Sequence, residues 1–286
     1  MRLDNSRESQ NVEDRRGRRS PLRGGGKIGL GGIVLALVAI YFGVDPNIVL
    51  QGMLEPEATQ YNQSQPAGTP ATDAESRFVS KVLADTEDSW GRIFQENGWG
   101  GYRAPKLVLF TGATPTACGT GQAAMGPFYC PGDDKVYLDL SFFRQMAQQL
   151  DSPGDFAQAY VIGHEVAHHV QHLIGVTDKV DQLRQRANAT QANQLSVRVE
   201  LQADCLAGVW ANHSNTQRNT LEPGDIDEAL NAASAIGDDR LQKQAQGYAV
   251  PDSFTHGSSA QRVSWFKRGF ESGKTSQCDT FNANSL

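Results

Sequence analysis

The chain has 286 residues, of which 39% are hydrophobic and 20% are charged, a composition that suits one globular domain with appended segments. Its formal net charge of −6 is uneven, because residues 1–27 carry eight basic and four acidic residues and leave −10 on the rest. An acidic body argues against nucleic acid as the main partner. A nucleic-acid protein that uses the basic arm is an alternative only if the hydrophobic run after it is a core helix.

That uncharged apolar run, Ile28–Val44, ends just before Asp45-Pro46. Its 17 residues are the lower limit for crossing a bilayer, and its four glycines and lack of a polar face disfavour a soluble amphipathic helix. By the positive-inside rule, the arginines before the run predict a cytoplasmic N-terminus. We therefore expect a disordered cytoplasmic arm (residues 1–27) and an uncleaved transmembrane signal anchor (residues 28–44), with a cleaved signal peptide as the alternative.

The next segment, Gln51–Thr72, lacks apolar periodicity, so residues 45–72 are predicted to be a flexible tether. Residues 73–286 would then be a folded domain in the periplasm or outside the cell, part of a single-pass membrane protein. Disulfides persist there, and the four cysteines allow three pairings. A Gly-rich turn favours Cys118–Cys130 together with Cys205–Cys278, with free buried cysteines as the alternative.

The folded domain begins with a predicted helix, since apolar residues recur at helical spacing between Phe78 and Phe94. Lys106–Thr111 predicts a strand, and Phe128–Cys130 with Lys135–Leu140 predicts a β-hairpin. Ser141 can cap a short helix through Leu150. Later helical patterns cover Gln191–His213, Gly224–Ala245 and Ser258–Gly273. Strands followed by helices indicate an α+β domain, and the edge of its hairpin would suit an extended substrate.

The stretch Val161–Gly175 contains the motif H-E-x-x-H as His164, Glu165 and His168. On a helix the two histidines lie one turn apart on one face, so both imidazoles can reach one metal ion. Glu165 can take a proton from a metal-bound water without being a ligand. The motif therefore predicts a catalytic zinc site. The alternative is a helix whose histidines are ordinary hydrogen-bonded polar groups.

A catalytic zinc ion normally has three protein ligands, and neither His169 nor His172 suits the third place. His172 lies about 12 Å along the helix from His164, and His169 points to a different side, so both are expected to be surface or outer histidines. Glu200 and Asp204 share one face of a later helix, among apolar neighbours. We expect Glu200 to bind zinc and Asp204 to orient a ligand histidine. A solvated acidic pair is the alternative.

H-E-x-x-H followed by E-x-x-x-D on a later helix resembles the gluzincin peptidases. The segments Gly126–Leu140 and Thr255–Arg262 extend the likeness over nearly the whole chain to the bacterial family of neutral zinc metallopeptidases. This resemblance implies a zincin-like fold and one zinc ion per chain. The second segment, T-H-G-S-S-A-Q-R, is also similar to the T-H-P…R segment of membrane-linked gluzincins related to the CAAX prenyl protease.

That likeness implies that His256 stabilises the oxyanion and that the arginine supports the site, although Gly257 replaces the proline. A loop histidine that caps the helix at Ser258 is the alternative. Tyr129 and Tyr137 are weaker candidates for the oxyanion.

The sequence as a whole predicts a membrane-anchored zinc metallopeptidase, of the endopeptidase kind, that acts on peptide or protein substrates. Its expected catalytic residues are Glu165 and His256. A different class of protein would keep the zinc for stability and recognise an envelope partner without cleaving it. The presence of Glu165 argues against that class, since a structural zinc site has no use for a base beside the metal.

Overall fold

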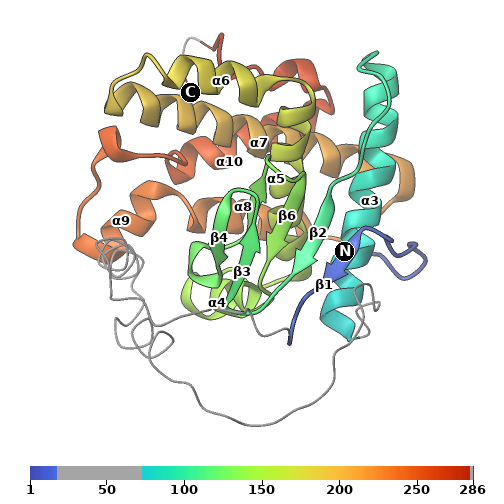
Figure 1. Ribbon diagram of the computed structural model, residues 1–286. Coiled ribbons are helices and arrows are strands. Elements are labelled where there is room, and N and C mark those ends of the chain that lie inside the picture. The colour runs from blue at the N-terminus through green and yellow to red at the C-terminus, as the bar shows by residue number, and fades with distance from the viewer. Residues whose placement is uncertain (18–72, 284–285) are drawn as a thin grey trace.

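The computed structural model describes residues 1–17, 73–283 and 286, which form an α+β fold rich in helices (Figure 1). The strands are β1 (Val12–Asp14), β2 (Lys106–Leu109), β3 (Ala113–Thr116), β4 (Gly119–Gln122), β5 (Phe128–Cys130) and β6 (Lys135–Leu138). The helices are α3 (Ala74–Glu96), α4 (Ser141–Gln149), α5 (Asp155–Leu173), α6 (Val176–Arg184), α7 (Ala189–Arg218), α8 (Asp225–Ala235), α9 (Asp238–Gln246) and α10 (Ser259–Ser272).

Four strands form a mixed sheet in the order β1-β2-β6-β5, and β3 pairs with β4 separately. β1, β2 and β6 run parallel, whereas β5 lies antiparallel to β6. Side chains on β2 and β6 alternate between the two faces, as strand geometry requires. One face enters the main core through Leu107, Leu109, Val136 and Leu138. The other face packs a smaller cluster that contains Val108, Phe110, Cys130 and Tyr137.

The helices that carry the H-E-x-x-H motif and the later acidic residues meet through small residues. Gly163 of α5 lies against Trp210 of α7, where an added Cβ would come within 2.6 Å of the indole ring. Gly269 of α10 lies against the backbone of α7, and its Cβ would come within 1.9 Å of the Cys205 carbonyl oxygen. Only glycine allows this approach, which packs α10 closely along α7.

Polar caps set where the two later helices begin. Asn188 accepts a hydrogen bond from the Gln191 amide at 2.9 Å, and the Gln191 side chain accepts one from the Asn188 amide at 3.0 Å, which together cap α7. Ser258 and Gln261 form the same reciprocal cap for α10. The predicted helix Gly224–Ala245 is instead two helices, α8 and α9. The break falls beside Gly237, whose backbone approaches the start of α10 too closely for a side chain.

Residues 1–17 belong to the folded domain, and their predicted disorder is wrong. β1 pairs with β2 (Figure 1), and the Met1 side chain lies in the main core. The Met1 amine donates to both carboxylate oxygens of Asp155 at 2.8 and 2.9 Å, and Arg7 lies 2.6 Å from the Asp88 carboxylate. The charge pattern gave no sign of these acidic partners, because they come from α3 and α5, far along the chain.

This arrangement also overturns the predicted membrane topology. A single crossing within residues 28–44 would place residues 1–17 and the domain on opposite sides of a bilayer, yet both contribute strands to one sheet. Across residues 1–17 and 73–283, no helix combines the length and the apolar character needed to cross a membrane. The predicted anchor (28–44) and tether (45–72) themselves lie outside the described residues. The single-pass architecture, with a cytoplasmic N-terminus and an external domain, is therefore wrong.

Two disulfides join the cysteines in the expected pairing, Cys118–Cys130 and Cys205–Cys278, and together they use all four cysteines. The first closes the loop that carries β3 and β4 onto β5. The second ties α7 to the segment that follows α10. Such bonds are typical of proteins that fold in an oxidising compartment.

We expect Gly269→Ala to destabilise the protein, because its methyl group would overlap the α7 backbone. Overpacking of this kind costs about 1–3 kcal/mol or more, which a urea unfolding curve measures directly. Gly91→Ala in α3 is the matched control, since no atom lies within 4 Å of the added methyl group. It should be neutral or stabilise by about 0.5–1 kcal/mol. Equal unfolding midpoints for the two variants would contradict this account of the α7–α10 contact.

Candidate metal centre

The three predicted metal ligands converge in the structure. His164 and His168 lie on α5, and their Nε2 atoms are 3.2 Å apart. Glu200 reaches them from α7, with carboxylate oxygens 3.1 Å from His164 Nε2 and 3.5 Å from His168 Nε2. Ligand atoms about 2 Å from a tetrahedral zinc ion lie about 3.3 Å from one another. Two imidazoles and a carboxylate at these separations fit zinc in both chemistry and size.

The charges of these groups depend on one another. Burial opposes a positive charge on His164, yet the carboxylates of Asp204 and Glu200 raise its pKa to about 10. Burial likewise opposes a negative charge on Glu200, yet the two histidines, His168 first, hold the pKa of that carboxyl well below its usual range. In the metal-free protein a proton thus lies where a cation would bind. Metal binding must release it, so metal affinity rises with pH.

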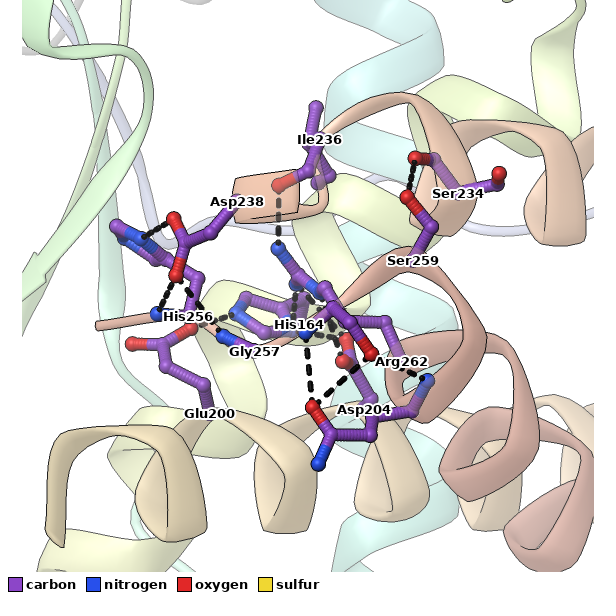
Figure 2. A network of polar contacts seen from close by, with 12 residues as sticks. His164, Glu200, Asp204, Ser234, Ile236, Asp238, His256, Gly257, Ser259 and Arg262 are labelled. Atoms are coloured by element: carbon purple, nitrogen blue, oxygen red, sulfur yellow. Dashed lines mark hydrogen bonds and ion pairs between the residues drawn. The ribbon is translucent and has the colours of Figure 1, made fainter. Parts of the chain in front are cut away.

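A buried ionic network contacts His164 on the Nδ1 side of its ring, away from the other candidate ligands (Figure 2). Its Nδ1 lies 2.8 Å from Asp204, and the Tyr160 hydroxyl donates to the same carboxylate at 2.6 Å. Arg262 donates to Asp204 from Nε and from Nη2, each at 2.9 Å. Because an ionised carboxylate only accepts, the hydrogen of neutral His164 is assigned to Nδ1 and its Nε2 is free to bind metal.

This network is almost fully excluded from water, since Asp204 is 0% exposed and Arg262 is 2% exposed. Burial alone would raise the pKa of Asp204, but its neighbours, Arg262 first, lower it. Asp204 is therefore an anion at neutral pH, and its predicted place behind a ligand histidine agrees with this geometry. From the sequence, a supporting role for Arg262 follows only from the resemblance of its segment to T-H-P…R.

His168 has a different kind of partner. Its Nδ1 lies 2.9 Å from Oε1 of Gln171, an amide that is 0% exposed. Gln171 was not among the predicted site residues, although its position three residues after His168 on one helix could have suggested this contact. One ligand histidine is thus oriented by a carboxylate and the other by a neutral amide.

Glu165, the predicted base, lies beside the three ligands and is 8% exposed. Burial raises the pKa of Glu165, against the opposing effect of the positive charges of His168 and His164. A carboxylate with a raised pKa can both accept and return a proton near neutral pH. Because Glu165 follows His164 in the chain, it lies close to the three candidate ligands, but it is not one of them.

His256 lies in the loop between α9 and α10 and is fixed by Asp238. One oxygen of Asp238 accepts hydrogen bonds from the backbone amides of Thr255, His256 and Gly257, at 2.7, 2.7 and 3.1 Å. The other oxygen lies 3.2 Å from Nδ1 of His256. Figure 2 shows the His256 imidazole on the same side of the network as the Glu200 carboxylate, and the charge of His256 helps to lower the pKa of Glu200.

Gly257 has a φ of 95°, which explains why proline is absent there. Proline is restricted to φ near −65°, so this loop follows a different backbone path from a T-H-P segment. The loop is ordered without a proline, because the Asp238 carboxylate holds its backbone. The His256 side chain is 47% exposed and accessible to a ligand.

The other candidate side chains, Tyr129 and Tyr137, make hydrogen bonds to the turn between β5 and β6. His169 is 1% exposed, contrary to a surface position, and lies 3.0 Å from the Tyr129 hydroxyl. Tyr129 donates to Asp134 at 3.0 Å, and Tyr137 donates to Asp133 at 2.7 Å. Both tyrosine hydroxyls are thereby engaged by aspartates of the turn. This makes His256 the better placed of the three oxyanion candidates.

This partly buried triad, with a carboxylate beside it, has the donor set that zinc centres of metallopeptidases use. Residues 1–281 match the family described as "Putative neutral zinc metallopeptidase", and the chain belongs to this family. The matched range includes the N-terminal residues that pack on the domain.

The chain is 54% identical over 289 residues to "Uncharacterized protein YpfJ" of Escherichia coli (strain K12). The alignment covers 98% of this chain and 99% of that protein. It is 42% identical over 262 residues to "Uncharacterized protein Mb2605" of Mycobacterium bovis and to "Uncharacterized protein Rv2575" of Mycobacterium tuberculosis (strain H37Rv). Each of these alignments covers 87% of this chain and 86% of the relative. No solved structure shows a significant match to the chain.

We expect Arg262→Gln to destabilise the protein by about 3–5 kcal/mol, because it leaves the buried Asp204 carboxylate without its cation. Chemical unfolding of the metal-free protein measures this. Arg268→Gln on the same helix is the control, since Arg268 is exposed and lies 4.5 Å from the centre of the Trp265 ring. Its loss should cost no more than about 1 kcal/mol. Similar losses of stability in the two variants would argue against a buried ion pair.

Proposed function

We propose that this protein is a zinc-dependent peptidase of the gluzincin type, with His164, His168 and Glu200 as its metal ligands and one zinc ion per chain. The observation that carries the proposal is a triad from two helices at zinc-compatible separations, with the buried carboxylate of Glu165 beside it. Membership of the family supports the general class. The finer assignment rests on the geometry of these side chains.

Zinc held by this triad would polarise the scissile carbonyl and lower the pKa of a bound water towards 7. Glu165 accepts the proton of the attacking water and later delivers it to the leaving amine. The raised pKa of Glu165 suits both steps, because its protonated form persists closer to neutral pH than that of an ordinary glutamate. Asp204 keeps His164 in the tautomer that leaves Nε2 free.

His256 supplies the hydrogen bond that the developing oxyanion requires. Its Nδ1 faces Asp238, so Nε2 is the nitrogen available to the substrate. A donor fixed in advance by a carboxylate stabilises the transition state without reorganising during the reaction. This role is assigned from the position of His256 beside Glu200 and from its fixed loop.

The substrate would lie along β5, the edge strand beside β6 in the described sheet. β5 runs next to α5, where Tyr129 contacts His169, the residue that follows the ligand His168. An edge strand binds an extended peptide through backbone hydrogen bonds. This mode of recognition requires no chain terminus, so we infer endopeptidase action on peptide or protein substrates.

A cavity of about 650 Å³ lies between the first turns of α7 and the loop that carries His256. Its lining includes Val197, one helical turn before Glu200, and Phe254 and Ser258, which flank His256 at two residues on either side. Pockets of this size accommodate side chains or small ligands. We infer that it receives part of the bound peptide.

We expect Glu165→Gln to keep the zinc and lose the activity, because the amide cannot accept the proton of the attacking water. The measurement is metal content together with cleavage of an unbiased peptide library by the full chain. About one zinc per chain in both proteins is expected, with cleavage reduced about 10²–10⁴-fold in the variant.

Zinc in both proteins without cleavage in either would favour the alternative, a module that recognises a partner protein without cutting it. That reading also requires partner binding to survive Glu165→Gln. Absence of zinc from both proteins would refute the site itself.

We expect Asp238→Asn to shift the alkaline limb of the kcat/KM profile to lower pH, by about one unit. Partial burial of the half-exposed His256 lowers its pKa, but the hydrogen bond with Asp238 and the charge of Glu200 outweigh this and raise it. The protonated imidazole donates to both Asp238 and the oxyanion, so activity falls as pH rises through that pKa. Removing the Asp238 charge lowers the pKa, and the fall begins at lower pH.

Asp239→Asn is the matched control, because Asp239 accepts from the Ser259 amide at 2.7 Å and is not hydrogen-bonded to His256. It should leave the alkaline limb in place. If the alkaline limb of Asp238→Asn is not shifted, the titration of His256 does not cause the fall in activity.

A further inference from the structure

The orientation of His168 depends on a chain of amides that leads away from the metal centre. Gln171 accepts from His168 Nδ1 through Oε1, and its Nε2 donates to the Val199 carbonyl at 2.8 Å and to Gln202 Oε1 at 3.0 Å. Both hydrogens of the amide are therefore used. If the Gln171 amide were flipped, its oxygen would face two other acceptors, the Val199 carbonyl and Gln202 Oε1. The amide oxygen must therefore point at His168.

Gln202 continues the chain in the same direction. Its Nε2 donates to the carbonyl oxygen of Cys278 at 3.0 Å, and its side chain is nearly buried at 8% exposed. Cys278 is bonded through sulfur to Cys205, the residue that follows Asp204 on α7. The relay His168–Gln171–Gln202–Cys278 thus links α5 to α7 and then to the segment after α10.

The segment after α10 is held on α7 by contacts besides the disulfide. Thr280 donates to the Arg198 carbonyl at 2.7 Å, and Arg198 donates to the Thr280 carbonyl. Thr280 is 0% exposed and Cys278 is 1% exposed, so this part of the segment is buried against the core. The Cys205–Cys278 bond is the covalent link that keeps the Cys278 carbonyl in place as an acceptor.

The two ligand histidines therefore differ in what fixes them. His164 is held by the buried Asp204–Arg262 ion pair, which needs no contact with the segment after α10. His168 is held by neutral amides whose last acceptor is the Cys278 carbonyl. Outer hydrogen bonds of this kind commonly change metal affinity about 10–100-fold when removed.

We propose that Gln171 and Gln202 are positioning residues that couple the zinc ligand His168 to the Cys205–Cys278 disulfide, so that reduction of this bond weakens zinc binding. The inference rests on the zinc site proposed above. The reductant is a dithiol: two electrons and two protons pass to the disulfide, the sulfur–sulfur bond breaks into two thiols, and the dithiol closes into its own disulfide. Loss of the bond frees the Cys278 carbonyl and loosens the relay.

The experiment measures the zinc dissociation constant of the full chain by competition with a chromogenic chelator. We expect Gln171→Leu, Gln202→Leu and the double variant Cys205→Ser/Cys278→Ser each to weaken zinc binding about tenfold. Two controls should match the wild type. Gln148→Leu alters an exposed glutamine on α4, and Cys118→Ser/Cys130→Ser removes the disulfide that has no part in the relay.

Combining variants separates a relay from independent effects. If Gln202 transmits the effect of the disulfide, removing the cysteines in the Gln202→Leu background should cause little further loss of zinc affinity. Reduction by dithiothreitol, which must reach a disulfide whose cysteines are 0% and 1% exposed, is followed by removal of the dithiol, because the dithiol itself binds zinc. The reduced wild type should then bind zinc more weakly than the oxidised wild type, whereas the same treatment should leave the Gln202→Leu protein nearly unchanged. Thermal unfolding of the metal-free variants measures any loss of stability. Such a loss by itself would not make the effects of the variants on the zinc dissociation constant non-additive.

Additive losses, or wild-type zinc affinity in a folded Gln202→Leu protein, would overturn the relay while leaving the zinc site intact. Failure of the wild type to bind zinc would overturn both. The readout is metal affinity rather than cleavage, so a protein that binds zinc but cleaves no peptide still tests the relay.

Discussion

The structure depends on one buried ion pair, between Asp204 of α7 and Arg262 of α10. Burying two charges costs much of what their attraction returns, so the net gain in stability is small. Separating the two charges would lower stability strongly, however, because each would be left buried without its partner. Arrangements of the helices that keep the pair intact are therefore favoured. Tyr160 and His164 of α5 bind the same carboxylate, so three helices are held in register at the metal centre. The glycine contacts between α7 and α10 permit this register, since a side chain at Gly269 would separate the two helices.

Much of the geometry of the candidate metal centre could be predicted from the sequence, because it depends on residues close together in the chain. His164 and His168 lie one turn apart, as do Glu200 and Asp204, so helical periodicity alone places each pair on one face. Both disulfides were also predictable once a Gly-rich turn suggested the first of them. The residues that sequence reasoning missed, Gln171 and Gln202, are neutral amides without a pattern of their own. Their roles arise only when α5 packs on α7.

The N-terminal segment shows why a local charge pattern can mislead. Its arginines, followed by an apolar run, suggested a topology signal, but Arg16 lies 2.7 Å from the carboxylate of Asp73, which caps α3, and β1 pairs with β2. Both partners are distant in the chain and cannot be inferred from composition. The break between α8 and α9 has a similar origin, because Gly237 is fixed by the approach of Ser259 and not by a helix-ending pattern nearby. In both places tertiary packing determined what the local sequence left open.

Gly257 shows how a loop that resembles a T-H-P segment can be ordered by different contacts. In a T-H-P segment the proline would stiffen the backbone after the histidine, whereas here that position has a φ of 95°, which proline cannot adopt. The loop is instead ordered by Asp238, whose single oxygen accepts three successive backbone amides. The other oxygen of the same carboxylate faces the His256 ring. One side chain thus fixes both the loop backbone and the imidazole, so the loop needs no proline to hold His256 in place.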